Sequence, residues 1–261
     1  MPVTDAPAKA RALYDARRTR VPIPPFTDAD PTLGMADGYA IQRELIDLLL
    51  ADGDRIVGHK VGLTSKPMQK MVGVDSPDYG PVLASTIYRD GDTIPASRFI
   101  APKIEAEIVF VIGERLEGPG VTVTQAHAAI AGAVAAMEIV DSRIADWRIK
   151  LADTVADLAS NGAMATSSRV VPITELDPRL VGMTLTRNGE LIDTGAGAAA
   201  LGDPVAVVAW LANVLGADGV ALEPGHLIMT GALHAAVPMT PGDVFRAEFD
   251  RLGPITVRVG D

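Results

Sequence analysis

The sequence of 261 residues contains no cysteine, and its aromatic fraction is only 4%. The lack of cysteine excludes disulfide bonds, thiolate nucleophiles and cysteine-ligated zinc sites. Because aromatic side chains are few, the core must be built from valine, isoleucine, leucine and alanine. The hydrophobic fraction of 48% is ample for one large domain, or for one domain with a smaller appendage.

Basic residues are also in deficit, with 23 lysines and arginines against 33 aspartates and glutamates. The net charge of −10 argues against nucleic acid as the main partner, because neutralising phosphates requires basic patches. An anionic small substrate stays possible, because one metal ion and one lysine can reverse the local field. No apolar run is long enough to span a membrane, and residues 1–10 lack the apolar core of a signal peptide. We therefore expect a soluble, cytoplasmic protein.

The first part of the chain is predicted to begin with helices and to continue into a strand. Apolar residues recur mostly at helical spacing over 6–52, and the clearest repeat covers 36–50. Residues 55–62 are predicted to form a strand, and proline and glycine turns are frequent over 64–100.

Two apolar strands are predicted in the middle of the chain. The first covers 102–112, and the second contains 135–141. Between them, Thr124 is a candidate cap for a helix that runs to about Ala131. The segment 143–160 is predicted to be a polar loop or helix.

The last part of the chain is predicted to combine one helix with several strands. Asp203 and Pro204 mark the start of the helix, and Gly216 marks its end. Segments separated by Pro-Gly turns follow and are predicted to be strands. This order favours an α+β fold, with helices packed outside the β structure, over a regular β–α–β succession.

Three carboxylates in the two middle strands are the most informative residues. Glu105 and Glu107 are two positions apart, so on a strand they point to the same face. Glu138 lies on a similarly apolar run, and burying ionised carboxylates is costly unless positive charge compensates them. A divalent cation that prefers oxygen ligands is the simplest compensation. The alternative is a solvated strand face on which Lys103 pairs with either acid of the first strand.

The segment 56–63 carries a lysine between two glycines. On a strand, Gly58, Lys60 and Gly62 share one face, so a ligand has room beside the ammonium group. The alternative is a solvated lysine on an edge strand, with glycines that serve a bulge. His59 points the other way and is expected to be packed or hydrogen-bonded.

Several segments resemble one known family in the same order along the chain. They are Gly58–Ser65, Gly73–Gly80, Glu105–Glu107, Glu138–Arg143 and Asp153–Asp157. Over most of its length, the chain is similar to the 2-keto-4-pentenoate hydratase and 4-oxalocrotonate decarboxylase family. That family is part of the fumarylacetoacetate hydrolase superfamily.

The resemblance implies an α+β fold and a metal site. The fold would be a rolled mixed β-sheet of the fumarylacetoacetate hydrolase C-terminal type, with helices packed outside it and an N-terminal helical region. Mg²⁺ or Mn²⁺ would bind to Glu105, Glu107 and Glu138, the acids that the strand pattern also indicates. We expect residues 1–95 to contribute the lysine segment and residues 96–261 to form the metal-binding catalytic core, with one continuous domain as the alternative.

The resemblance also implies roles for residues outside the metal site. Lys60 matches the active-site lysine of the family, and Asp78 matches an acidic residue implicated in the chemistry. Taken by itself, Asp78 fits turn initiation around Pro77. Ser160 lies where the family has a polar loop on the substrate side. Leu158 replaces a residue that is usually polar in the family, and we expect this change to reshape the pocket wall.

The implied activity is the addition of water to a 2-hydroxy-2,4-dienoate such as 2-hydroxypenta-2,4-dienoate. The product would be a 4-hydroxy-2-oxo acid in the meta-cleavage catabolism of aromatic compounds. The main alternative is decarboxylation of 4-oxalocrotonate, a 2-oxo-3-hexenedioate, although the segment Asp141–Lys150 is more similar to the hydratase branch. A hydrolase or tautomerase of acylpyruvates or oxaloacetate is a further alternative, but the usual His-Glu pair of those enzymes is missing. A non-catalytic binding protein is disfavoured because all three acids are present.

The expected ligand is therefore a small anionic 2-oxo or 2-hydroxy dienoate. The resemblance also implies a homo-oligomer, commonly a pentamer or decamer, which requires an exposed apolar patch. A pathway aldolase is a further partner that the family suggests, whereas neither nucleic acid nor a membrane is expected.

Overall fold

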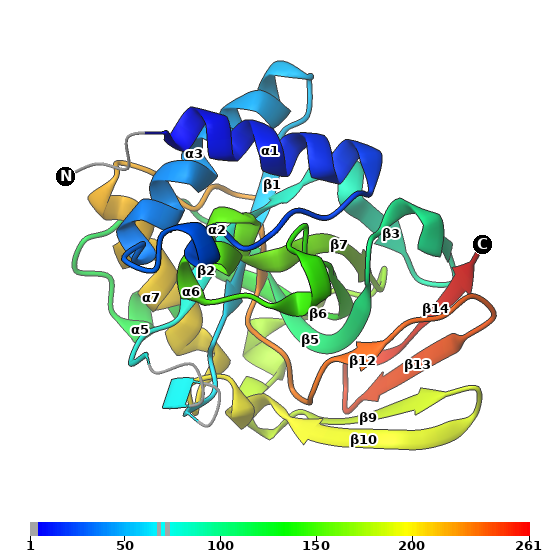
Figure 1. The fold of residues 1–261 in the computed structure, drawn as a ribbon. Helices are drawn as coiled ribbons and strands as arrows, with labels where there is room; N and C mark the ends of the chain where they lie inside the picture. Colours follow the sequence, from blue (N-terminus) through cyan, green and yellow to red (C-terminus); the bar gives the residue numbers. More distant parts are fainter. Residues whose placement is uncertain (1–4, 67–68, 71–73) are drawn as a thin grey trace.

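The computed structural model describes residues 5–66, 69–70 and 74–261 (Figure 1). The chain begins with helices α1 (Ala6–Thr19), α2 (Phe26–Ala29) and α3 (Met35–Ala51). Leu13 of α1 and Leu45 of α3 are buried in one apolar cluster between these helices. The helical prediction for this region is therefore confirmed, because each helix buries its apolar stripe against the next one.

A nine-stranded mixed sheet forms the centre of the molecule. Its main path runs in the order β2-β1-β11-β5-β6-β7-β3, and β12 and β8 pair with β5 and β6. The strands are β1 (Ile56–Gly62), β2 (Asp78–Leu83), β3 (Ile87–Arg89), β5 (Lys103–Ile112), β6 (Ile130–Val140), β7 (Asn161–Thr166), β8 (Val171–Pro172), β11 (Leu227–Met229) and β12 (Val237–Pro238). The strands predicted around Lys60, Glu105 and Glu138 are thus present as β1, β5 and β6.

The large sheet curls into a roll. β2 contacts β7, although the two strands are far apart along the path of the sheet. Five apolar side chains from five strands pack together inside it: Val82, Val109, Val134, Met164 and Met229. Because strand residues alternate between faces, Glu105 and Glu107 share the face of Val109, and Glu138 shares the face of Val134. The acids therefore lie toward one end of an interior that valine and methionine fill elsewhere.

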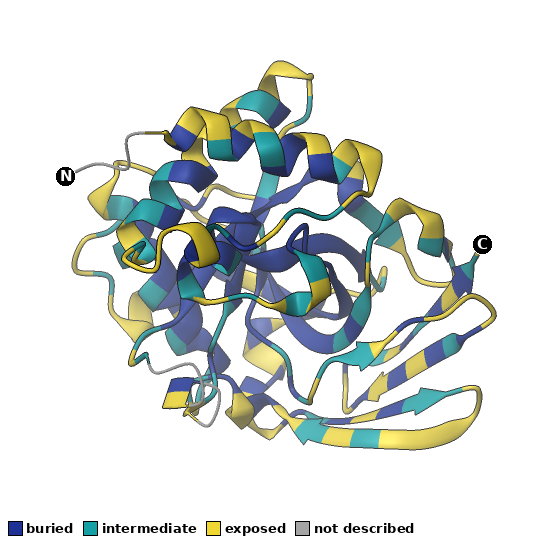
Figure 2. Cartoon of the chain, in the orientation of Figure 1, coloured by how far each residue is buried: buried dark blue, intermediate teal, exposed yellow. Residues whose placement is uncertain are grey.

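A second sheet of five strands extends from the roll (Figure 1). Its order is β10-β9-β13-β14-β4, with strands β4 (Thr93–Pro95), β9 (Gly182–Arg187), β10 (Glu190–Ala196), β13 (Val244–Phe249) and β14 (Gly253–Gly260). Buried and exposed residues alternate along β13, as Figure 2 shows, and Phe245 belongs to the main apolar core. One face of this sheet therefore packs on the roll while the other faces solvent.

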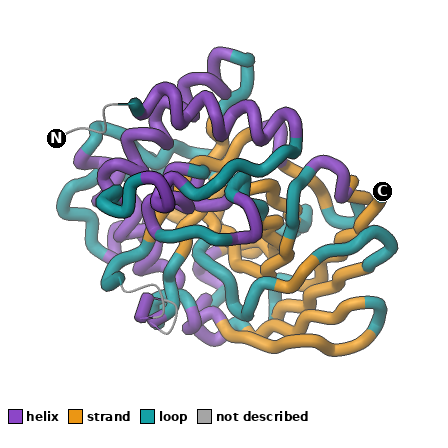
Figure 3. The backbone as a smooth tube through the Cα atoms, in the orientation of Figure 1, coloured by secondary structure: helices purple, strands orange, loops and turns teal. Residues whose placement is uncertain are grey.

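The remaining helices are α5 (Val123–Ala129), α6 (Leu151–Ala156) and α7 (Pro204–Ala217), and they lie outside the strands (Figure 3). Asp203 caps α7, as predicted. The predicted cap of α5 is wrong by two residues, because Thr122 and not Thr124 caps it. The Thr122 hydroxyl accepts a hydrogen bond from the backbone amide of Gln125. In turn, the backbone amide of Thr122 donates to Gln125 Oε1.

Short 3₁₀ turns join these elements. They are η1 (Ala84–Thr86), η2 (Ala96–Arg98), η3 (Ala145–Trp147), η4 (Leu158–Ser160), η5 (Ile173–Glu175), η6 (Pro178–Leu180) and η7 (Gly197–Ala199). The segment 143–160 was expected to be a polar loop or helix, and it contains η3, α6 and η4. Three of its charged residues, Arg143, Asp153 and Asp157, are buried, whereas Asp146, Arg148 and Lys150 are exposed, so only part of this polar segment lies inside the molecule.

The architecture confirms the α+β prediction, with mixed sheets, helices outside them and an N-terminal helical region. β1 and β2 belong to the same sheet as β5 and β6. A boundary at residue 95 stays a prediction. No helix in the described part of the chain has the length and apolar character needed to cross a membrane.

Candidate metal centre and active site

Three acidic side chains converge at one end of the roll. β5 and β6 pair in antiparallel register, and this register places Glu105 opposite Glu138. One carboxylate oxygen from each of Glu105, Glu107 and Glu138 lies within 4.8 Å of the others. Glu107 and Glu138 are buried, and Glu105 is partly buried. The two-residue spacing and the strand register together therefore gather the acids that the sequence indicates as metal ligands.

Burial and mutual repulsion make these acids hard to ionise together. Burial, followed by the charge of Glu138, raises the pKa of Glu105 to about 7. The same two causes raise the pKa of Glu107 well above its ordinary value. Among the described residues, Glu138 Oε2 has no hydrogen-bond partner. Three carboxylates gathered around one point, one of them with an oxygen that accepts no hydrogen bond from a described residue, fit a divalent cation with a preference for oxygen ligands.

Two neighbouring groups orient the acids. Gly231 donates its backbone N–H to Glu107 Oε2 at 3.0 Å. Asn161 donates from Nδ2 to Glu138 Oε1 at 2.9 Å. Glu107 and Glu138 therefore each have one oxygen held by a hydrogen bond, which limits the directions in which the other oxygen can point.

Lys60 reaches the same end of the roll from β1. Its Nζ lies 3.5 Å from Glu138 Oε2 and donates to the carbonyl of Ala159 at 3.0 Å. Burial alone would lower the pKa of Lys60, but attraction to Glu138, Asp78 and the other two acids raises it above its usual range. The side chain is buried beside the acids, so the alternative of a solvated lysine is not what the structure shows.

Asp78 begins strand β2 and lies opposite Gly62 in the register. A Cβ atom on Gly62 would lie 2.2 Å from Asp78 Oδ1, so a larger residue would displace this carboxyl group. Burial raises the pKa of Asp78, although Lys60 opposes the shift. The turn role that its sequence context suggests is wrong, because Asp78 is a buried strand residue beside Lys60.

Ser160 lies at the end of η4, on the wall of the pocket. Its hydroxyl lies 3.0 Å from the hydroxyl of Thr154. Leu158, Ala159 and Ser160 have left-handed backbone angles, with φ of 55°, 52° and 57°. Consecutive left-handed residues other than glycine are strained, and such strain persists only where surrounding contacts hold it. The strained turn delivers the carbonyl of Ala159 to Lys60.

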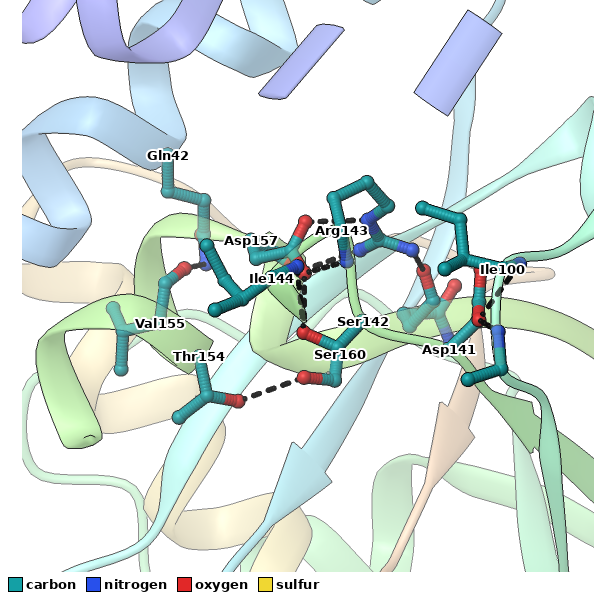
Figure 4. A network of polar contacts seen from close by, with 12 residues as sticks. Gln42, Ile100, Asp141, Ser142, Arg143, Ile144, Thr154, Val155, Asp157 and Ser160 are labelled. Atoms are coloured by element: carbon teal, nitrogen blue, oxygen red, sulfur yellow. Dashed lines mark hydrogen bonds and ion pairs between the residues drawn. The ribbon is translucent and has the colours of Figure 1, made fainter. Parts of the chain in front are cut away.

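A buried ion pair holds this turn, and sequence reasoning assigned it no role. The Arg143 guanidinium donates from Nε to the Asp157 carboxylate, from Nη2 to the Asp157 carbonyl at 2.6 Å and from Nη1 to the Asn161 carbonyl at 3.1 Å (Figure 4). The amide of Ser160 also donates to the Asp157 carbonyl, at 2.9 Å. The sequence shows charged residues in this segment, but it does not show that Arg143 and Asp157 are buried together.

The loop between β11 and β12 is the second feature that the sequence did not reveal. β5 pairs with β11 at Val109 and with β12 at Ile104, and the loop spans the gap between these pairings. Inside the gap, Ala106 donates its backbone N–H to His234 Nε2 at 2.7 Å. The loop thus supplies a side-chain acceptor in place of a strand carbonyl, directly between Glu105 and Glu107. The segment around His234 carries no spacing typical of metal ligands, so the sequence gives little signal for it.

A cavity of about 460 Å³ contains this site. Lys60, Asp78, Glu105 and Glu107 line its polar end, and Ser160 also faces it. The rest of the wall is largely apolar and comprises residues such as Val61, Leu63, Val140, Trp147, Ile149, Leu151, Ala235 and Ala236. The site therefore combines an acidic, metal-binding end with an apolar compartment, which suits a small acid with a hydrocarbon tail.

One sequence expectation about this wall is wrong, and the alternative pairing of Lys103 with an acid is not observed in the described part of the chain. Leu158 packs in the apolar cluster of the N-terminal helices and does not line the cavity. Lys103 lies over the ring of Trp147, 4.1 Å from its centroid, and makes no ion pair with a described acid. His59 is buried as expected, but its Nδ1 has no hydrogen-bond partner among the described residues.

Comparison with known proteins gives consistent matches over nearly the whole chain. Residues 54–260 match the model of the fumarylacetoacetate (FAA) hydrolase C-terminal family. A 2-keto-4-pentenoate hydratase of Paraburkholderia xenovorans is 44% identical over 94% of this chain and 91% of its own. A 2-hydroxyhexa-2,4-dienoate hydratase of Comamonas testosteroni is 38% identical over 96% of both chains. Among solved structures, 4-oxalocrotonate decarboxylase from Pseudomonas putida G7, complexed with magnesium and adipate, superposes with a TM-score of 0.94. Its sequence is 37% identical, and the match covers 97% of each chain.

Proposed function

Because the chain belongs to the fumarylacetoacetate (FAA) hydrolase C-terminal family, we propose that it is a metal-dependent hydratase of a 2-hydroxy-2,4-dienoate. A representative substrate is 2-hydroxypenta-2,4-dienoate, and the product is 4-hydroxy-2-oxopentanoate. The observation that carries the proposal is the three-acid cluster with Lys60 and Asp78 beside it, at the polar end of a largely apolar cavity. The names of the similar hydratases support this substrate class.

Glu105, Glu107 and Glu138 would hold Mg²⁺ or Mn²⁺ through the oxygens that face one another. When bound, such a cation supplies Lewis-acid stabilisation of the negative charge that develops on a 2-oxo acid during proton transfer. The hydrogen bonds from Gly231 and Asn161 keep two of the acids in place for this role.

The reaction requires two proton transfers to carbon. In the first stage, the 2-hydroxyl group loses its proton and C5 gains one, which leaves a 3,4-double bond conjugated with the new 2-oxo group. In the second stage, water adds across that bond, with the hydroxyl on C4 and a proton on C3. Atoms balance with the net gain of one water molecule.

We assign these proton transfers to Lys60 and Asp78. Burial raises the pKa of Asp78, so its carboxyl group retains a proton more readily than an exposed aspartate and can donate it. Lys60 Nζ carries a proton next to the acids and exchanges it with the substrate, or pairs with the substrate carboxylate. We assign the hydroxyl of Ser160, on the cavity wall, to substrate binding.

An ultraviolet assay tests the proposed activity. The diene chromophore of 2-hydroxypenta-2,4-dienoate should disappear with Mg²⁺ or Mn²⁺ present and persist after chelation, and mass spectrometry should show a product heavier by one water. A loss of chromophore without water gain would show ketonisation alone and would contradict the hydratase.

Decarboxylation of 4-oxalocrotonate is the second candidate function. Lys103 and Lys150 line the cavity and are available for a second carboxylate. The similar decarboxylase binds magnesium and adipate, which is a dicarboxylate. Metal-dependent CO₂ release from 2-oxo-3-hexenedioate, with no hydration of the monocarboxylate, would move the assignment to this reaction.

We further infer that the chain forms a homo-oligomer, a pentamer or decamer as the family resemblance implies. Leu180 is 75% exposed and Leu191 is 63% exposed, so apolar surface is available for self-association. Light scattering after size-exclusion chromatography tests this, and a monomer at micromolar concentration would contradict it. An aldolase that cleaves the 4-hydroxy-2-oxo product is the pathway partner we propose, and a cytoplasmic location stays a prediction.

A further inference from the structure

A second cavity of about 460 Å³ lies apart from the candidate active site. It is bounded by the last turn of α1, the end of α3, the loop before β5 and the ends of β6 and β7. No described residue lines both cavities. Its wall includes five arginines: Arg17, Arg18, Arg20, Arg98 and Arg143. In a chain of net charge −10 with only 23 lysines and arginines, this concentration of positive charge requires an explanation.

The aspartates in the wall offset only part of this charge. Asp141 accepts hydrogen bonds from two backbone amides, at 2.8 and 3.1 Å. Asp54 accepts one from Ser85 Oγ at 2.5 Å. Asp52 accepts one from the hydroxyl of Tyr14 at 2.5 Å and pairs with a single arginine at the rim. Because Arg143 is paired with Asp157 and Arg18 with Asp52, the cavity keeps three arginines against the carboxylates of Asp54 and Asp141, which leaves a positive balance.

Three of the arginines make no ion pair with any described residue. Arg98 donates to the hydroxyl of Tyr88 at 2.6 Å and to a backbone carbonyl, and Arg20 donates to backbone carbonyls. The Arg17 side chain makes neither a hydrogen bond nor an ion pair within the described part of the chain, although it is half-buried. Burial, and then repulsion from Arg143, lowers the pKa of Arg17 to about 10, although attraction to Asp157 and Asp54 opposes the shift. An anion bound between these guanidinium groups would compensate both the burial of the Arg17 charge and its repulsion from Arg143.

We propose that this cavity is a binding site for a small polyanion, whose phosphate or carboxylate groups are held by Arg17 and Arg98. Guanidinium groups bind both kinds of anion through paired N–H donors, which suits arginine better than lysine for this role. Arg143 forms the floor, where its side chain is 3% exposed, and Arg18 lies at the rim, where it is 64% exposed. The volume exceeds that of a single phosphate ion and is typical of a metabolite site.

Calorimetric titration of the Mg²⁺-loaded protein at low ionic strength tests the site. Inorganic phosphate and tricarballylate, a tricarboxylate, serve as probes, and the tighter of the two identifies the anion class. R17Q and R98Q should each weaken binding by about tenfold, or about 1.4 kcal/mol. R258Q is the matched control, because Arg258 is exposed, donates to a backbone carbonyl and lies outside the cavity.

Each outcome of this titration decides the proposal. Binding that weakens in R17Q and R98Q but not in R258Q supports it. Equal binding in all variants would place the anion elsewhere, the active site included, and would overturn the proposal. If neither probe binds to the wild-type protein with a dissociation constant below about 10 mM, the proposal is overturned too. If R17Q fails to fold, R98Q still decides the outcome, because Arg98 is exposed and bonds only neutral groups.

Discussion

Glu105 on β5 lies directly opposite Glu138 on β6, so two acids occupy one rung of an antiparallel ladder. Like charges in directly opposed positions destabilise a sheet, and here both lie toward the interior of a roll. Lys60, 3.5 Å from Glu138, is the cation that compensates them within the protein. The opposed carboxylates therefore lower the stability of the metal-free fold and concentrate negative charge at one point, which is typical of a cation-binding site.

Substitution of Glu107 by glutamine should separate metal binding from stability. We expect Mg²⁺ affinity to fall by more than about 100-fold, because loss of residues that merely orient metal ligands already costs about 10- to 100-fold. Turnover should fall with it, whereas the metal-free protein should be as stable as wild type or more so, since a buried repulsive charge is removed. Calorimetry and urea unfolding measure the two effects.

The control for this experiment is Glu114→Gln, because Glu114 is an exposed acid just beyond β5. It should leave Mg²⁺ affinity unchanged. A fully active Glu107→Gln variant that needs no metal would defeat the assignment of the site.

Metal affinity should depend on pH. Folding raises the pKa of Glu105 from 4.5 to about 7, so the folded metal-free protein favours the protonated acid. The stability from this group is complete below pH 4.5 and is lost as pH rises toward about 7. Because a bound cation requires the ionised form, Mg²⁺ affinity should rise over the same interval.

Unfolding free energy and Mg²⁺ dissociation constants, measured between about pH 5 and about pH 8, check both trends. The Glu105→Gln variant supplies the comparison, because its metal-free stability should vary less over this range. An Mg²⁺ affinity that stays constant with pH would show that the acids are already ionised in the metal-free protein.

Local spacing explains which parts of the site the sequence predicts. The shared face of Glu105 and Glu107, and the room beside Lys60 between two glycines, follow from the two-residue period of a strand. The helix that begins at Pro204 follows equally from local capping chemistry. Such features depend only on neighbours in the chain, so one sequence is enough to find them.

Features that depend on distant pairing were not predictable in this way. Asp78 resembles a turn residue until β2 pairs with β1 and buries it beside Lys60. Leu158 lies in a left-handed turn that the distant Arg143 holds, and the contact of His234 with β5 depends on a gap between two strand pairings. Neither leaves a periodic pattern in the sequence.

Substitution of Lys60 by alanine should reduce turnover by about 10²- to 10⁴-fold if the lysine transfers a proton. Mg²⁺ affinity should be kept or increase, because a positive charge next to Glu138 is removed. If Lys60 only binds the substrate carboxylate, KM should rise while kcat changes little. Steady-state kinetics distinguish the two roles, with Lys60→Met as the variant of similar size; near-native turnover in both would remove Lys60 from the reaction.

Loss of the buried pair between Arg143 and Asp157 should destabilise the whole fold. Arg143→Met leaves a buried carboxylate without its partner, which typically costs about 3–5 kcal/mol. Asp157→Asn in the same chain should recover part of that loss, since the uncompensated charge is then gone. Urea unfolding measures both variants, and additive losses in the double variant would show that the pair is not coupled.

His234 should position the metal site without touching the metal. Its Nε2 accepts the backbone N–H of Ala106, so His234→Ala leaves a buried donor unpaired at a cost of about 1–3 kcal/mol. Because Ala106 lies between Glu105 and Glu107, we also expect weaker Mg²⁺ binding, and His234→Gln should restore part of it by offering an acceptor oxygen. A purely structural role would lower the unfolding free energy and leave the Mg²⁺ dissociation constant unchanged. His127→Ala, an exposed histidine on α5, is the control that should change neither quantity.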